Sequence, residues 1–421
     1  MLYPDSVEFL YSLGNEIKSV KFGLESIRSV LDALGNPQDA PRIVHVAGTN
    51  GKGSTCAMIE SALRLHGYRT ALYTSPHLVE PTERICIAGV PVTREAFADA
   101  FRQVHECNEH LIAAGQLEHH TTYFETVTAM GFLLMRSANV EVAVVEVGLG
   151  GRLDATNVVH PALTVITPVD FDHEQFLGNS LDSIAFEKAG ILKPGVPAIF
   201  AAQRPEAQSV LDHRAAELGI EVIRTGEYDV TKLTVSPRGS EFLTKRTQPM
   251  HIRCPLAGAH QVENALAAVA ALEQLQIPAE AIESGIAATR WPGRLEVIGQ
   301  NPEILLDGAH NPAGARALAA HLRQFYAGRR LRLFYGAMRD KSVQEITEIL
   351  FPLADEVILT TLTSPRAVRP DALLRTSDHR NMSVAESAAD ALALARATDP
   401  DDVAVITGSL YLVGEIESLL Q

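Results

Sequence analysis

The sequence is poor in cysteine and has no pattern that would use its cysteines together. Its four cysteines are scattered without CxxC spacing: Cys56, Cys86, Cys107 and Cys254. This spacing argues against a disulfide framework and a structural zinc site, and it favours a reducing cytoplasm. The amino terminus lacks a basic region followed by an apolar stretch, and no run of about 18 apolar residues occurs. We therefore expect a cytoplasmic protein without a membrane span.

An excess of basic residues is missing as well. Lys and Arg number 36 against 51 Asp and Glu, so the net charge is -15. This balance predicts no broad basic face for nucleic acid or anionic lipid, and any anionic substrate must meet positive charge gathered locally in a cleft. The sequence also has no extended heptad pattern, which favours a monomer. A chain of 421 residues, 46% of them hydrophobic, is large enough for roughly two to three domains with sizeable cores.

Short apolar runs alternate with longer segments of helical period. This alternation predicts βα units around parallel sheets that are buried on both faces. Residues 224–253 are instead polar, rich in threonine and alternating, which predicts an insertion of antiparallel hairpins. The segment Arg290-Trp-Pro-Gly-Arg-Leu-Glu296 precedes a second series of βα units and predicts domains at 1–293 and 294–421. The runs expected to form strands are Ile43–Ala47, Val140–Val147, Leu163–Thr167, Ala198–Ala201, Ile304–Leu306, Leu331–Tyr335, Glu356–Thr360 and Val403–Ile406.

The sharpest motif is a phosphate loop, Gly48-Thr-Asn-Gly-Lys-Gly-Ser-Thr55, which joins an apolar run to a helix-compatible segment. Backbone N–H groups of such a loop and the following helix N-terminus surround phosphate oxygens, and Lys52 would reach the β- and γ-phosphates. The usual pattern GxxxxGK[ST] is met only in part, because Ala47 stands at the first glycine and Gly53 separates Lys52 from Ser54. An ordinary glycine turn is the alternative interpretation.

Acidic residues follow two predicted strands that should lie beside this loop. Glu146 ends one strand, and Asp170-Phe-Asp172-His173 follows the next. Ligands of open parallel sheets bind beyond the carboxyl ends of the strands, so Glu146 and His173 are candidate magnesium ligands. A structural glutamate and a surface histidine are the alternatives.

Lys188 is predicted to face a core. It lies four residues after Ile184 and three before Ile191, which places the three on one helix face. A lysine facing a core is rare unless it is paired or chemically altered. We treat Lys188 as a candidate functional residue, with a lysine at the edge of the core that extends to water as the alternative.

Taken together, these motifs resemble the folylpolyglutamate synthase/dihydrofolate synthase family of the Mur ligases, in which the bifunctional bacterial enzymes are the expected type. The resemblance runs over essentially the whole chain. The motifs that carry it are Gly48–Thr55, Thr74-Ser-Pro-His-Leu78, Phe124-Glu125, Glu146–Asn157, Glu187-Lys-Ala-Gly190, His260-Gln-Val-Glu-Asn264, Pro292-Gly-Arg294 and Asp307-Gly-Ala-His-Asn-Pro312.

The resemblance implies an α/β fold: a P-loop NTPase-like parallel sheet domain with a small antiparallel insertion, then a smaller Rossmann-like C-terminal domain. ATP would lie between them with Mg²⁺ at two sites, and a monovalent cation such as K⁺ is a further candidate. Lys188 matches a position that carbon dioxide converts to a carbamate. The implied metal ligands are Ser75, Glu146 and His173, and the implied catalytic residues are Lys52, Glu146, His173, Lys188 and Arg294. The implied ATP contacts are Asn50, Gly51, Lys52, Gly53, Ser54, Asn264, Arg294 and Asp307.

The implied substrates are ATP, L-glutamate and dihydropteroate or a reduced folate. Ser26 stands where the family has arginine, and Arg28 is a partial substitute. Arg366 and Arg369 are candidates for the glutamate carboxylates. The implied contacts of the pterin or folate are Gly23, Leu24, Glu25, Thr122, Tyr123, Phe124, Glu125, Leu153, Asp154 and Ala155.

The implied reaction is ATP-dependent amide ligation. The γ-phosphoryl group of ATP would convert a carboxylate into an acyl phosphate, and the amine of glutamate would then displace phosphate. Asp307 and His310 are candidates for the base. The alternatives are a UDP-muramoyl amino acid ligase, a P-loop kinase of a small metabolite and a nucleotide-dependent regulatory module.

Overall fold

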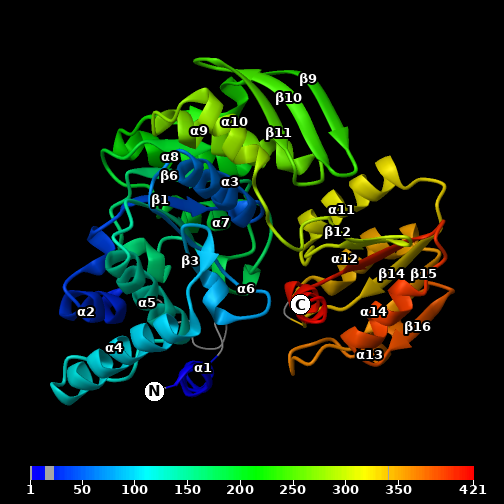
Figure 1. Cartoon of the computed structure of the whole chain (residues 1–421), viewed down its shortest axis with the longest axis horizontal. Coiled ribbons are helices and arrows are strands. Elements are labelled where there is room, and N and C mark those ends of the chain that lie inside the picture. Colours follow the sequence, from blue (N-terminus) through cyan, green and yellow to red (C-terminus); the bar gives the residue numbers. More distant parts are fainter. Residues whose placement is uncertain (1, 15–22, 340) are drawn as a thin grey trace.

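The computed structural model describes residues 2–14, 23–339 and 341–421, which form two α/β units side by side (Figure 1). The first unit contains an eight-stranded sheet of order β4-β3-β2-β5-β1-β6-β7-β8. Six neighbouring strands run parallel, namely β2, β5, β1, β6, β7 and β8. Strands β3 and β4 extend the sheet at one edge by antiparallel pairing. The strands are β1 Arg42–Ala47, β2 Thr70–Tyr73, β3 Ile85–Ile87, β4 Val90–Pro91, β5 Val142–Glu146, β6 Leu163–Ile166, β7 Ala198–Phe200 and β8 Val222–Arg224.

Helices cover both faces of this sheet (Figure 1). In β5, Val142 and Val144 pack with α3, α9 and α10, whereas Ala143 and Val145 pack with α1, α2, α4 and α5. Burial on both sides explains why the strands read as continuous apolar runs. The helices are α1 Tyr3–Ser12, α2 Glu25–Ala33, α3 Lys52–Leu65, α4 Arg94–Ala113, α5 Tyr123–Ser137, α6 Glu174–Leu177, α7 Leu181–Ala189, α8 Pro205–Leu218, α9 His260–Gln274 and α10 Ala279–Ala287.

The polar, alternating stretch forms a three-stranded antiparallel sheet beside α9 and α10 (Figure 1). Its strands are β9 Asp229–Ser236, β10 Gly239–Lys245 and β11 Pro249–Cys254. Along β11 exposed and buried residues alternate, and Phe242 and Ile252 join the core around α3 and α9. A sheet with one buried face gives this pattern of alternation. The predicted antiparallel insertion is therefore confirmed.

The second unit is a six-stranded sheet of order β12-β13-β17-β14-β15-β16, parallel except for β12. Helices α11 and α12 pack on one face, and α14 and α15 on the other. The strands are β12 Glu296–Gln300, β13 Glu303–Leu306, β14 Leu331–Tyr335, β15 Glu356–Thr360, β16 Met382–Ala385 and β17 Val403–Thr407. The helices are α11 Pro312–Phe325, α12 Val343–Leu350, α13 Pro370–Thr376, α14 Ala388–Arg396 and α15 Leu410–Ser418.

All eight apolar runs expected to form strands do so, and the predicted fold class is confirmed. The strands without a prediction are short or lie at a sheet edge, as do β4 and β16. Short 3-10 helices occur at Pro37–Asp39, Pro81–Arg84, Ala155–Val158, Thr225–Glu227 and Phe351–Leu353. Among the helices that the structure describes, none has the length and apolar character needed to cross a membrane.

Candidate active site

Three neighbouring strands deliver the candidate residues to one edge of the large sheet. The register pairs Val46 of β1 with Glu146 of β5, and Ala47 of β1 with Ile166 of β6. The phosphate loop therefore begins beside Glu146, and the segment after β6 carries His173 toward the same edge. This is the position at which ligands of open parallel sheets bind.

The phosphate loop has the backbone that an anion site needs. Gly48 and Gly51 have positive φ angles of 151° and 84°, and α3 begins immediately afterwards at Lys52. The Thr49 N–H donates to the Pro168 carbonyl oxygen at 3.0 Å, which ties the loop to the segment after β6. The Nζ of Lys52 lies 3.2 Å from the Thr49 oxygen and 3.9 Å from Glu146 Oε1. The backbone N–H groups of a helix start and the ammonium group of Lys52 together favour phosphate here.

Gly51→Ala is expected to weaken ATP binding at least about tenfold, because the new Cβ would lie 2.1 Å from Asn264 Oδ1. A side chain in this left-handed conformation also costs roughly 1–2 kcal/mol. Isothermal titration with an ATP analogue measures the affinity. Gly67→Ala is the matched control, since Gly67 also has a positive φ but its Cβ would meet nothing within 4 Å. Equal ATP affinities in the two variants would contradict the role of the contact.

Glu146 is a buried carboxylate, only 5% exposed. Among the described residues, its hydrogen-bond and ion-pair contacts are long. Its Oε2 accepts a long hydrogen bond of 3.4 Å from the Ser75 N–H, and Lys52 Nζ stands 3.9 Å from Oε1. Burial raises the pKa of Glu146, and the charge of Lys52 opposes that shift. A buried carboxylate with open coordination beside a hydroxyl-bearing residue is suited to a hard divalent cation such as Mg²⁺.

Lys188 lies inside the protein, as its spacing predicts. Its side chain is 4% exposed, and Ile184 and Ile191 are fully buried. The Nζ donates to the Gly48 carbonyl oxygen at 2.7 Å, which joins α7 to the phosphate loop. Burial, together with repulsion from Lys52, lowers the pKa of Lys188 to about 7. Near neutral pH a large fraction of this lysine is therefore an uncharged amine.

The second unit closes over this edge through a polar network. Asn311 starts α11, where its Oδ1 accepts from the Gly314 N–H at 2.8 Å. Its Nδ2 donates to Asn50 Oδ1 at 2.9 Å and to Asp172 Oδ2 at 3.0 Å. Lys341 Nζ donates to Asp172 Oδ1 at 2.7 Å and lies 3.1 Å from His173 Nε2. The phosphate loop and the segment after β6 are thus held by one residue pair from the C-terminal unit.

The titration of this network follows from its burial. Burial by itself would raise the pKa of Asp172, yet the ammonium of Lys341 holds it well below the usual value. Burial lowers the pKa of His173 to about 3, so its ring is neutral near pH 7. A neutral imidazole can ligate a metal ion, but a protonated one cannot.

Asp307 and His310 differ in what their side chains can still do. The two oxygens of Asp307 accept from the Leu295 and Ala309 N–H groups at 2.9 and 3.0 Å. The Nδ1 of His310 lies 2.8 Å from the Gly308 carbonyl oxygen, and its Nε2 is 3.8 Å from Asp172. Burial lowers the pKa of His310 to about 4. Backbone groups contact both oxygens of Asp307 but only one ring nitrogen of His310. Of the two candidate bases, His310 therefore has an acceptor atom, Nε2, that no backbone group of the described residues engages.

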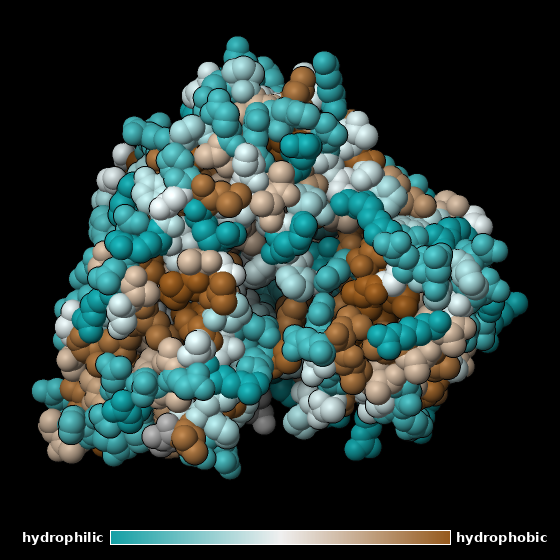
Figure 2. Space-filling view, in the orientation of Figure 1, coloured by the Kyte–Doolittle hydropathy of each residue, from teal (hydrophilic) through white to brown (hydrophobic). Residues whose placement is uncertain are grey.

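Two adjoining cavities lie in this region, and the face of the molecule is hollowed between the two units (Figure 2). The larger, of about 500 Å³, is lined by every residue predicted to contact ATP, ligate metal or act in catalysis. They are Asn50, Gly51, Lys52, Gly53, Ser54, Ser75, Glu146, His173, Lys188, Asn264, Arg294 and Asp307.

The smaller cavity, of about 210 Å³, receives most of the residues predicted to contact the pterin or folate. Those that line it are Gly23, Thr122, Phe124, Glu125, Leu153, Asp154 and Ala155. Leu24, Glu25 and Tyr123 do not line it, and the exposed Arg28 does not either. Tyr123 is buried and stacks on Tyr11, as a core ring does.

Two of the acidic residues in this smaller cavity organise its walls. Asp154 accepts hydrogen bonds from the N–H groups of Leu149 and Thr156. Glu125 accepts from the Thr122 N–H at 2.8 Å in a capping box at the start of α5. Because backbone donors engage both carboxylates, we infer that these residues shape the cavity more than they bind a ligand.

Sequence reasoning missed Lys341 and the contact of Asn311 with the phosphate loop. Asn311 caps α11, and its amide also reaches Asn50 of that loop. Lys341 had no signal in its own segment, since its partners Asp172 and His173 are 169 and 168 residues away in the chain. Arg366 lines the smaller cavity, whereas Arg369 is exposed outside it.

Comparison with known proteins matches the two units separately. The Mur ligase middle domain matches residues 46–272, and the glutamate ligase domain of Mur ligases matches residues 293–410. The chain is 36% identical over 414 residues to a dihydrofolate synthase/folylpolyglutamate synthase of Bacillus subtilis, covering 96% of each chain. The chain belongs to this family. It is an ATP-dependent ligase.

Solved structures of the family share the whole fold. A Mycobacterium tuberculosis folylpolyglutamate synthase complexed with ADP and AMPPCP gives a TM-score of 0.91 at 34% identity, covering 99% of this chain and 98% of that one. An Escherichia coli enzyme of the family, in complex with DHPP and ADP, gives 0.89 at 31% identity, covering 100% and 98%. Binding of the adenine nucleotide by family members agrees with ATP as the cofactor here.

Proposed function

We propose that this ligase joins L-glutamate to dihydropteroate, to the glutamate tail of reduced folates, or to both, through an acyl phosphate. The observation that carries the proposal is that the larger cavity, which contains the phosphate loop, and the smaller, largely apolar cavity share a wall at Ser75, His173 and His310. A flat aromatic acid in the smaller cavity would direct its carboxylate at the γ-phosphate of ATP. Concave, mostly apolar sites with a few polar groups are typical of such ligands.

In this mechanism the chain aligns the reactants and neutralises charge. A substrate carboxylate oxygen attacks the γ-phosphorus, the bond to the β-phosphate oxygen breaks, and ADP leaves. Lys52 and Arg294 would bind the phosphate oxygens, while Asn264 and Asp307 would contact the rest of ATP. Ser75 and Glu146 would hold one Mg²⁺ and His173 a second, and Mg²⁺ supplies further neutralisation of the phosphate charge.

The amine of glutamate then attacks the acyl carbon, and phosphate leaves with the electrons of the broken C–O bond. We assign the amine proton to His310, whose Nε2 is not occupied by backbone. Arg366 would bind a glutamate carboxylate, since it lines the smaller cavity, and Lys341, the other Lys or Arg among the described residues there, is engaged by Asp172. A pyrophosphate group of a UDP-linked substrate would need more positive charge than Arg366 alone supplies.

Several further assignments belong to the same proposal. We place the domain boundary at 293/294, just before the first strand of the second sheet. The chain would act as a monomer, because its sequence has no extended heptad pattern. A monovalent cation such as K⁺ would assist at the phosphates. Lys188 would carry a carbamate, whose negative charge would balance the positive charge of Lys52.

The substrate is tested by incubating the full chain with ATP, Mg²⁺, labelled glutamate and either dihydropteroate or a tetrahydrofolate. We expect ADP and amide in equal amounts only when glutamate is present, and the product mass identifies the acceptor. A small-molecule kinase would release ADP without an amino acid, and a regulatory module would incorporate no label. Amide formation only with a UDP-muramoyl acceptor would overturn the folate assignment.

Lys341→Ala is expected to uncouple the reaction, so that more ADP than amide is formed. Loss of the contacts of Lys341 with Asp172 and His173 would loosen closure of the C-terminal unit, and water would then reach the acyl phosphate. The ratio of ADP to amide measures this effect. Arg323→Ala, which removes an exposed cation from the same unit, should keep a ratio of one. An unchanged ratio in Lys341→Ala would contradict the closing role.

A further inference from the structure

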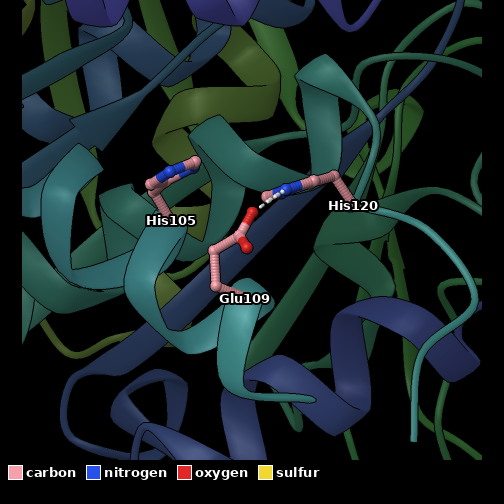
Figure 3. Close-up of side chains that lie close together, drawn as sticks. All are labelled: His105, Glu109 and His120. Atoms are coloured by element: carbon pink, nitrogen blue, oxygen red, sulfur yellow. Dashed lines mark hydrogen bonds and ion pairs between the residues drawn. The ribbon is translucent and has the colours of Figure 1, made fainter. Parts of the chain in front are cut away.

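Three potential metal ligands meet on the outer side of the first unit. His105 and Glu109 lie one turn apart on α4, and His120 comes from the segment between α4 and α5 (Figure 3). One donor atom of each residue lies within 4.8 Å of the other two. None of the three lines the larger or the smaller cavity of the candidate active site. The cluster is therefore separate from the site of ligation.

The side chains already converge. His120 Nε2 and Glu109 Oε1 are 2.6 Å apart. The rings of His105 and His120 lie nearly parallel at a centroid distance of 5.2 Å, with the Glu109 carboxylate beside them (Figure 3). The Nδ1 of His105 is buried and has no hydrogen-bond partner among the described residues. A buried nitrogen without a partner is uncommon and points to a ligand that would satisfy it.

The chemistry of the donors selects the ion. Two imidazoles and one carboxylate are a known donor set for Zn²⁺ with one open position, whereas Mg²⁺ and Ca²⁺ prefer oxygen ligands. In a tetrahedral site with bonds of about 2.0–2.1 Å, the donors lie about 3.3 Å apart. Rotation of the exposed Glu109 side chain and of the two rings would bring the three donors to that spacing.

We propose that His105, Glu109 and His120 bind one Zn²⁺ or a similar borderline divalent ion, with water as the fourth ligand. The ion would act on structure. Phe9 of α1 packs edge-on against both rings, at centroid distances of 4.8 and 5.5 Å. Fixing the rings would fix α1 against α4. Burial also holds the pKa of His105 below its usual value, so the ring is neutral and able to ligate near pH 7.

The neighbouring residues provide matched controls. His119 adjoins His120 in the chain and is exposed, and His110 is an exposed histidine on the same helix, next to Glu109. Neither belongs to the cluster. Replacing either one removes a single histidine, as His105→Ala and His120→Ala do. Nonspecific Zn²⁺ binding should therefore fall by the same amount, while the proposed site stays intact. His105→Ala, Glu109→Gln and His120→Ala each remove one proposed ligand.

The test titrates the metal-free full chain with Zn²⁺, and separately with Co²⁺, without ATP and with excess Mg²⁺ to occupy the cleft. The wild-type chain should bind one Zn²⁺, show the visible absorption of four-coordinate Co²⁺ and gain thermal stability. Each ligand variant should lose the Co²⁺ band and at least about tenfold in Zn²⁺ affinity, whereas His119→Ala and His110→Ala should keep both. If His105→Ala does not fold, Glu109→Gln and His120→Ala still decide, because Glu109 is exposed and His120 lies outside any helix or strand. A wild-type chain that binds no Zn²⁺, or a His120→Ala chain that binds it like His119→Ala, would overturn the proposal.

Discussion

Lys52→Ala is expected to reduce kcat by at least about a thousandfold while the fold remains intact. In the structure Lys52 is the first residue of α3, with its Nζ close to the Thr49 oxygen and to Glu146. When the γ-phosphoryl group is transferred, negative charge spreads over oxygens at this position, and a fixed ammonium stabilises that charge more than it stabilises ground-state ATP. Alanine also has the highest intrinsic helix propensity, so α3 should persist.

The measurement is ADP and amide formation under saturating substrates, with thermal unfolding recorded for the same samples. Lys245→Ala, which removes an exposed lysine on β10, should keep both the rate and the melting temperature. Substantial ligase activity in Lys52→Ala would refute the phosphate role of this residue. A large fall in melting temperature would show that Lys52 acts on stability instead.

Lys188→Ala is expected to lower kcat by at least about a hundredfold, because it removes a buried charge from the phosphate site. A pKa of about 7 leaves about half of the Lys188 amine uncharged at pH 7, whereas an ordinary lysine would be almost wholly protonated. The neutral nitrogen can attack carbon dioxide, forming an N–C bond and releasing one proton. The carbamate keeps one N–H, which can still donate to the Gly48 oxygen that Nζ contacts now. Conversion of a cation to an anion also removes the repulsion from Lys52.

The carbamate is detected by nuclear magnetic resonance of the chain equilibrated with ¹³C-bicarbonate. A carbamate signal is expected in the wild type and in Lys193→Ala, a partly buried lysine whose pKa burial also lowers, but not in Lys188→Ala. Carbamate and activity should fall together as the pH decreases through about 7, because protonation removes the nucleophilic amine. A signal that persists in Lys188→Ala would exclude this residue as its source.

Local pattern was sufficient for the parts of the site that lie within single segments. The apolar run of β1, the glycines after it and the helix start at Lys52 are adjacent in the chain, so their geometry follows from short-range sterics and hydrogen bonding. The burial of Lys188 followed from helical spacing in the same way. Tyr123 shows the limit, because spacing alone could not distinguish a cavity wall from a core position on α5.

The sequence by itself determined the order of βα units, the antiparallel insertion, the phosphate loop and the family to which the chain belongs. Only the tertiary structure brought Lys341 to Asp172 and Asn311 to Asn50, pairs separated by 169 and 261 residues. It alone placed His120 beside His105 and Glu109. The reason is physical: periodicity fixes which face of an element is buried, but which polar side chains then meet across two units depends on how the sheets twist and pack, and no local pattern carries that information.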